Sequence, residues 1–161
     1  MNKTLGMVSG ICLASTMLAG QNSVPAGFEH WSGDSLKQLE QTLKAEAGSD
    51  THRMSMRRLQ DFPNDLFMLS VREGDGVVEW HEIQADVFFV ESGLATLVVG
   101  GEMVGGETTE PHEKRNGKIE GGTRVKLSAG DVVRIPPKTP HQILLDGGKS
   151  FTYCVIKIKG Y

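Results

Sequence analysis

Two carboxylates and two histidines, from the middle of the chain onwards, are the residues best suited to chemistry. Glu79 and His81 stand two apart, Asp86 follows, and His141 ends a later segment that begins at Gly130. Residues two apart share one face of a strand, so Glu79 and His81 point the same way if this segment is extended. Imidazole nitrogens and carboxylate oxygens on strands can bind Zn, Mn, Fe, Ni or Cu and leave positions open for a ligand.

A metal is one of two explanations for this set. Inward-facing charged groups are costly unless a metal or a polar ligand compensates them, which favours a metal centre. The alternative is a metal-free cluster in which His81, Asp86 and His141 hydrogen-bond one another. Glu79 has two possible roles as well, because a carboxylate that is not a ligand can act as a general base.

The segments around these residues predict an all-β domain. From residue 52 onwards, apolar residues alternate with a period of two, and glycine-rich turns separate the runs. The pattern predicts strands over residues 53–57, 66–71, 77–82, 86–91, 94–99, 123–127, 131–135, 141–146 and 151–159. This rhythm is typical of an antiparallel barrel or sandwich. Residues 101–122 interrupt it, and we expect a long hairpin arm or a mobile loop there, with His112 exposed.

One helix is predicted before the strands, over residues 35–47. Ser35 and Gln38 have the spacing of a capping box, and Gly48 is a typical helix end. Apolar residues recur on one face of this helix, at Leu36, Leu39 and Leu43. We therefore expect the helix to pack outside the sheet through that face.

The first 26 residues have the features of a secretory signal peptide. Lys3 supplies a basic start, residues 5–18 are uncharged and mostly apolar or small, and Ala26 is a plausible cleavage point. Ala19-Gly20 is another, and a disordered or core-packed segment is the alternative to a signal. The favoured interpretation is an exported protein, periplasmic or secreted, with one domain over residues 27–161 and its core over residues 65–159.

The charge of the chain limits the kinds of partner it can bind, and its cysteine content limits the disulfides it can form. The net charge is −3, or −4 once residues 1–26 and their single lysine are removed. The charges are scattered, so the sequence predicts no nucleic-acid partner and no membrane association after signal removal. Export would leave Cys154 as the only cysteine, which excludes an internal disulfide; a buried strand position is expected for it.

The spacing of the candidate ligands resembles the two motifs of the cupin superfamily. The first motif has His-x-His, three or four residues, a glutamate, six residues and a glycine; this chain has Glu79-Trp80-His81, four residues, Asp86, six residues and Gly93. The second motif is similar to the segment from Gly130 to Leu145, which includes Pro136 and His141. Lys138 and Leu145 stand where that motif has a glycine and an asparagine.

This resemblance implies a small jelly-roll β-barrel with a divalent metal. By position, His81 and His141 match histidine ligands, Asp86 replaces the glutamate, and Glu79 replaces the first histidine. The implied function is that of an exported metal-binding cupin, either a metal-dependent isomerase, lyase or oxygenase acting on a small polar molecule, or a non-catalytic binding protein for a small ligand. A homodimer is also implied, because cupin barrels commonly pair through apolar outer strands.

Overall fold

The computed structural model of the protein describes residues 24–161. These residues belong to two units, a short stretch that ends at His30 and a larger unit over Trp31–Tyr161. Most of the predicted signal peptide, residues 1–23, lies outside the described residues. Within the described part of the chain, no helix is long and apolar enough to cross a membrane.

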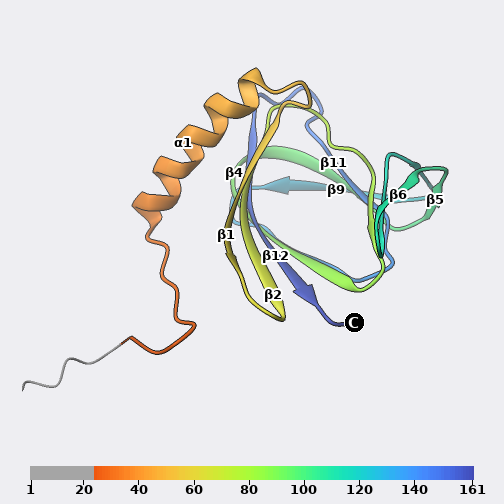
Figure 1. The fold of residues 1–161 in the computed structure, drawn as a ribbon. Helices are drawn as coiled ribbons and strands as arrows, with labels where there is room; N and C mark the ends of the chain where they lie inside the picture. Colours follow the sequence, from red (N-terminus) through yellow and green to blue (C-terminus); the bar gives the residue numbers. More distant parts are fainter. Residues whose placement is uncertain (1–23) are drawn as a thin grey trace, which may run out of the picture. The chain divides into compact units, whose positions relative to one another are not determined.

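The larger unit consists of one helix followed by twelve strands (Figure 1). The helix is α1 (Gly33–Ser49), and the strands are β1 (Met54–Asp61), β2 (Asp65–Arg72), β3 (Glu79–His81), β4 (Gln84–Val99), β5 (Glu102–Val104), β6 (Glu107–Glu110), β7 (Glu113–Arg115), β8 (Lys118–Glu120), β9 (Thr123–Ser128), β10 (Val132–Ile135), β11 (His141–Leu144) and β12 (Phe151–Lys159). All pairings are antiparallel, which confirms the predicted all-β class.

The main sheet curls so that one of its faces forms the interior. Its strands follow the order β1-β2-β12-β4-β11-β3-β7-β6, and β9 and β10 also pair with β4. Alternate residues of these strands point inward and form a single apolar core, which includes Met68, Phe88, Leu97, Phe151 and Tyr153. The period of two in the sequence therefore corresponds to the inner and outer faces of the sheet.

Strand β4 is the longest strand and joins the two halves of the barrel. Its first part pairs with β10 and β12, and its second part pairs with β9 and β11. The sequence predicted two strands here, separated at Gly93, but the chain continues through a corner. Gly93 has a φ of 89°, and a Cβ atom there would lie 2.1 Å from the carbonyl oxygen of Ser150, so only glycine fits this close approach.

Helix α1 packs on the outside of the sheet, as predicted. Leu43 and Ala47 are fully buried against Leu69 and Val71 of β2. The cap differs from the prediction: Ser32, not Ser35, is the N-cap, and its side chain accepts a hydrogen bond from the Ser35 amide. The helix can begin earlier because Ser32 has the extended backbone that capping requires.

Residues 101–122 form an ordered arm that projects from one side of the barrel (Figure 1). Its outer strands β5 and β8 pair with each other, whereas β6 pairs with β7. Strand β7 also pairs with β3, which carries Glu79 and His81. This pairing extends the main sheet and brings arm residues to the candidate site.

Candidate metal centre

The predicted site residues converge because they are direct partners across neighbouring strands. His141 of β11 lies opposite Glu79 of β3. His81 of the same strand lies opposite Glu113 of the arm. The register of the sheet, more than the separation along the chain, therefore brings these side chains to one place.

His81 is buried and held at both ring nitrogens. Its Nδ1 lies 2.5 Å from a carboxylate oxygen of Glu113, and its Nε2 lies 2.9 Å from Nζ of Lys157. An ammonium group only donates, so Nε2 accepts this hydrogen bond and the neutral ring carries its proton on Nδ1, which donates to Glu113. The Nε2 lone pair therefore points into the site.

His141 is also hydrogen-bonded through its Nδ1. Its Nδ1 lies 3.0 Å from the carbonyl oxygen of Thr139, which can only accept, so Nδ1 carries a proton. Its Nε2 lies 3.6 Å from Oδ2 of Asp86. In the neutral ring, this nitrogen lone pair faces a carboxylate, an arrangement that a cation between the two would stabilise.

Glu79 is fixed by two arginines. Its Oε2 lies 2.9 Å from Nη1 of Arg115, and its Oε1 lies 3.4 Å from Nη2 of Arg72. Burial alone would raise the pKa of Glu79, but the charges of Arg115, Lys157 and Arg72, and that of His141 when its ring is protonated, outweigh it and lower that pKa. A carboxylate held ionised in this way is better suited to bind a cation than to act as a general base.

Asp86 lies beside both histidines and is paired with Lys157. Nζ of Lys157 is 2.9 Å and 3.0 Å from the two carboxylate oxygens of Asp86, and the two residues are direct partners across β4 and β12. Burial would raise the pKa of Asp86, but the adjacent His141 and His81 rings and the charge of Lys157 lower it strongly. Asp86 is therefore ionised.

Three of the four predicted ligands have the geometry of a metal site. Ligand atoms of Glu79, His81 and His141 all lie within 4.8 Å of one another. Both histidines donate from Nδ1 to an oxygen and present Nε2 to the centre, which is the orientation that metal-binding histidines usually have. A divalent ion such as Zn²⁺ fits this N₂O donor set. Asp86 is adjacent, 3.3 Å from Nε2 of His81.

The sequence did not identify three residues of the site. Glu113 and Arg115 come from the arm, and Lys157 comes from the last strand. For Lys157, the signal available was a charged residue on the same face of the strand as buried Tyr153 and Val155. Glu113 and Arg115 gave no signal, because the arm is rich in charges throughout.

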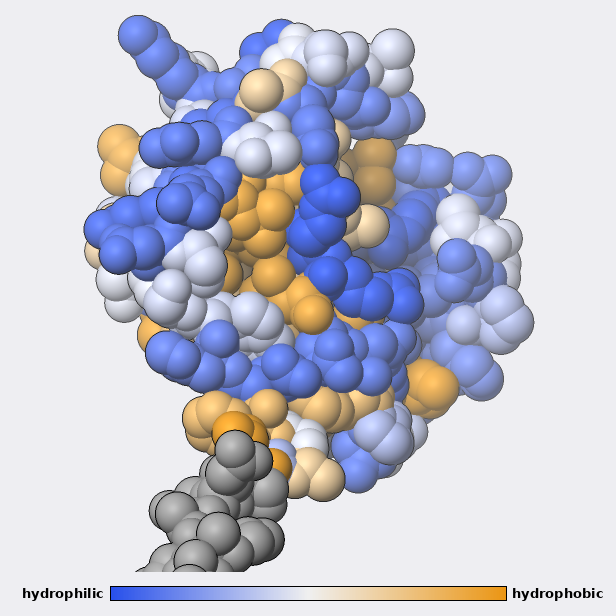
Figure 2. Space-filling model, turned by 60° about the vertical axis from the view of Figure 1, so that its left-hand side comes forward, coloured by the Kyte–Doolittle hydropathy of each residue, from blue (hydrophilic) through white to orange (hydrophobic). Residues whose placement is uncertain are grey.

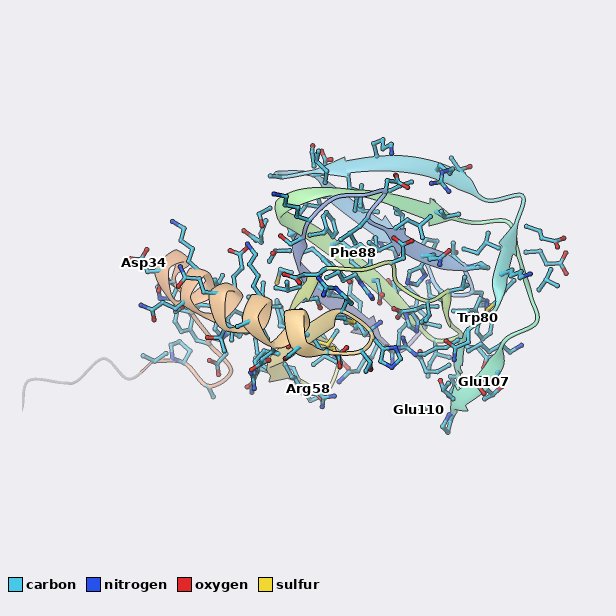
Figure 3. The ribbon with its side chains drawn as sticks, turned by 90° about the horizontal axis from the view of Figure 1, so that it is seen from above. Asp34, Arg58, Trp80, Phe88, Glu107 and Glu110 are labelled. Carbon is cyan, nitrogen blue, oxygen red and sulfur yellow. The ribbon has the colours of Figure 1, made fainter. Side chains whose placement is uncertain are left out.

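Position 138 keeps the backbone of the cupin motif although it is not a glycine. Lys138 has a φ of 60°, in the left-handed region, and its amide donates to the carbonyl oxygen of His81 at 2.7 Å. This bond connects the loop before His141 to β3. Trp80, between Glu79 and His81, faces the other way, towards the arm (Figure 3), and Nζ of Lys114 lies 5.1 Å from its ring centroid.

Solved structures with this fold support the architecture. The cupin domain of Schizosaccharomyces pombe Cnp3 is 10% identical with a TM-score of 0.51, covering 67% of this chain and 66% of that one. A protein with a double-stranded β-helix domain from Klebsiella pneumoniae is 16% identical with a TM-score of 0.50, covering 66% and 77%. TT1209 from Thermus thermophilus is 16% identical with a TM-score of 0.50, covering 68% and 87%.

These similarities are in structure, since no protein-family model and no curated protein matches the chain significantly. At such identities they show the fold and not the activity. The jelly-roll β-barrel predicted from the two motifs is confirmed, and the domain has the cupin fold.

Proposed function

We propose that this cupin-fold domain binds one divalent metal ion through Glu79, His81 and His141. The observation that carries the proposal is the paired orientation of the histidines. Each ring is buried, each Nδ1 is hydrogen-bonded to an oxygen, and each Nε2 faces the carboxylates of the site. A purely structural histidine needs no such matched arrangement with a second ring and a third donor within 4.8 Å.

Three protein ligands leave coordination positions for a small polar molecule. A metal bound there would polarise a carbonyl or activate an oxygen ligand, which suits isomerase, lyase or oxygenase chemistry. The residues around it have separate roles: Arg72 and Arg115 hold Glu79, and Glu113 orients His81. The signal-like N-terminus adds the proposal that this chemistry takes place outside the cytoplasm, in the periplasm or after secretion.

Metal analysis of the full-length chain tests this proposal. The protein is purified without an affinity tag, and its metal content is measured by mass spectrometry. It is then stripped with a chelator and titrated with Zn²⁺, Mn²⁺, Fe²⁺, Ni²⁺ and Cu²⁺. We expect one ion per chain, and loss of binding in His81→Ala and His141→Ala. His52→Ala is the matched control, since His52 is exposed. No binding by the native chain would refute the proposal.

A second candidate function, binding of a small ligand without a metal, rests on Lys157. Its ammonium contacts His81 and both oxygens of Asp86, so the polar cluster has a cation of its own. In that case the site recognises a small polar molecule through protein groups alone. A native chain that binds none of the five ions but remains folded would favour this candidate over the metal centre.

A further inference from the structure

Lys157 satisfies the same groups that a metal ion would need. Its ammonium group has three N–H donors, and three acceptors lie within hydrogen-bonding distance: Nε2 of His81 and both oxygens of Asp86. The side chain is 13% exposed, so these hydrogen bonds are largely shielded from water. Lys157 is thus a fully bonded cation inside the candidate centre.

The hydrogen bond to His81 and metal binding exclude each other. Nε2 of His81 has one lone pair, which cannot serve an ammonium proton and a metal ion at once. The Nδ1 nitrogen offers no substitute, because it donates to Glu113. A metal ion that uses His81 must therefore displace Lys157 from it.

Charge adds to this competition. The site holds three carboxylates, from Glu79, Asp86 and Glu113, and three cationic side chains contact them. The site is therefore neutral with Lys157 in place and neutral histidines. A divalent ion added beside Lys157 would meet a like charge at close range, in a poorly solvated environment.

We propose that Lys157 is a built-in competitor for the metal centre, which lowers its affinity for divalent ions and keeps the site ordered without one. The inference rests on the proposed metal function. Replacement of Lys157 by methionine keeps an unbranched side chain, one atom shorter, and removes the charge. Asp86 then loses the ammonium group that donates to both of its carboxylate oxygens, and the buried carboxylate attracts a cation more strongly.

Zn²⁺ titration against a chromogenic chelator tests the competition in the full-length chain. We expect Lys157→Met to bind Zn²⁺ at least about 10-fold more tightly than the native chain, the equivalent of one charge-assisted hydrogen bond. Lys157→Arg keeps a cation and should gain little. Lys159→Met is the matched control: it lies two residues along the same strand, and its amine bonds to Asp61 and Phe62 instead.

A heat-denaturation scan provides a second readout. Metal-free Lys157→Met should unfold at a lower temperature than the native chain, and Zn²⁺ should raise its midpoint more than it raises the native one. If this variant does not fold without metal, Asp86→Asn with Lys157→Met removes the unpaired carboxylate. The double variant should still bind Zn²⁺ more tightly than Asp86→Asn alone.

The outcomes separate the inference from the proposed function. If the native chain binds Zn²⁺ and Lys157→Met binds it no more tightly, the competitor role is wrong and the metal function stands. If neither the native chain nor any variant binds Zn²⁺, both are wrong. Tighter binding in Lys159→Met as well would mean that a general loss of positive charge, and not the contact with His81, explains the gain.

Discussion

Glu113 offers the most direct test of how the arm supports the site. Its carboxylate accepts the Nδ1 proton of His81 at 2.5 Å and is 13% exposed. If this contact orients His81, its removal should weaken metal binding although Glu113 is not itself a ligand. Loss of such partners typically costs about 10–100-fold in metal affinity.

The two substitutions should differ in size. In Glu113→Gln, the amide oxygen can still accept the Nδ1 proton but without a charge. Hydrogen bonds to charged groups contribute about 1.5–3 kcal/mol and neutral ones about 0.5–1.5 kcal/mol, so the difference of about 1–1.5 kcal/mol corresponds to about 10-fold. Glu113→Ala leaves the buried Nδ1–H without its partner, and we expect a loss nearer 100-fold.

Chelator competition measures these affinities, and nitrogen NMR of the His81 ring reports the tautomer independently of any metal. In the native chain the proton should reside on Nδ1, and in Glu113→Ala the population with the proton on Nε2 should increase. Glu110→Gln is the control: Glu110 is exposed in the same hairpin, at the outer edge of the arm (Figure 3). Equal affinities for Glu113→Ala and Glu110→Gln, with an unchanged tautomer, would refute the orientation argument.

Three further predictions concern the rest of the molecule. Leu43→Ala should lower the free energy of unfolding by about 2–5 kcal/mol in a urea titration, because Leu43 of α1 is fully buried between the helix and the sheet. A smaller loss would mean that the helix is loosely attached. Burial raises the pKa of Cys154 to about 11 from 9.0, so at pH 9 about 1% of the native thiol is ionised instead of half. In a Cys12→Ser background, alkylation of the Cys154 thiol at pH 9 should be about 50-fold slower in the native state than in urea. The free energy of unfolding should also fall as the pH rises above 9, because the thiol loses its proton at a lower pH in the unfolded chain than in the native one. The predicted homodimer should elute as a dimer in gel filtration, and Phe89→Asp on the outer face should shift it towards monomer; a native monomer would contradict the prediction.

The surface supports the choice of Phe89 for that test. Phe89 of β4 and Val132 of β10 are direct partners on the outside of the sheet, and they are 39% and 61% exposed. Figure 2 shows one face of the molecule on which apolar side chains gather in a hollow framed by hydrophilic ones. Exposed apolar surface of this kind is typical of protein–protein contacts.

The sequence alone determined the motif positions and most of the strands outside the arm. Alternation with a period of two is a local property, since each residue's face follows from that of its neighbour, and it predicted β2, β9, β10 and β12 closely. The spacing from Glu79 to His81 and from Gly130 to His141 identified the cupin fold. The helix was also predicted, apart from its cap at Ser32.

Only the tertiary structure decided which side chains surround the candidate ligands. Glu113, Arg115 and Lys157 lie directly opposite His81, Glu79 and Asp86 across neighbouring strands. Register between strands depends on turns, corners such as Gly93 and irregular pairings far along the chain, and no local pattern encodes it. The sequence could therefore show which residues can bind a metal, but not that a lysine competes for the same histidine.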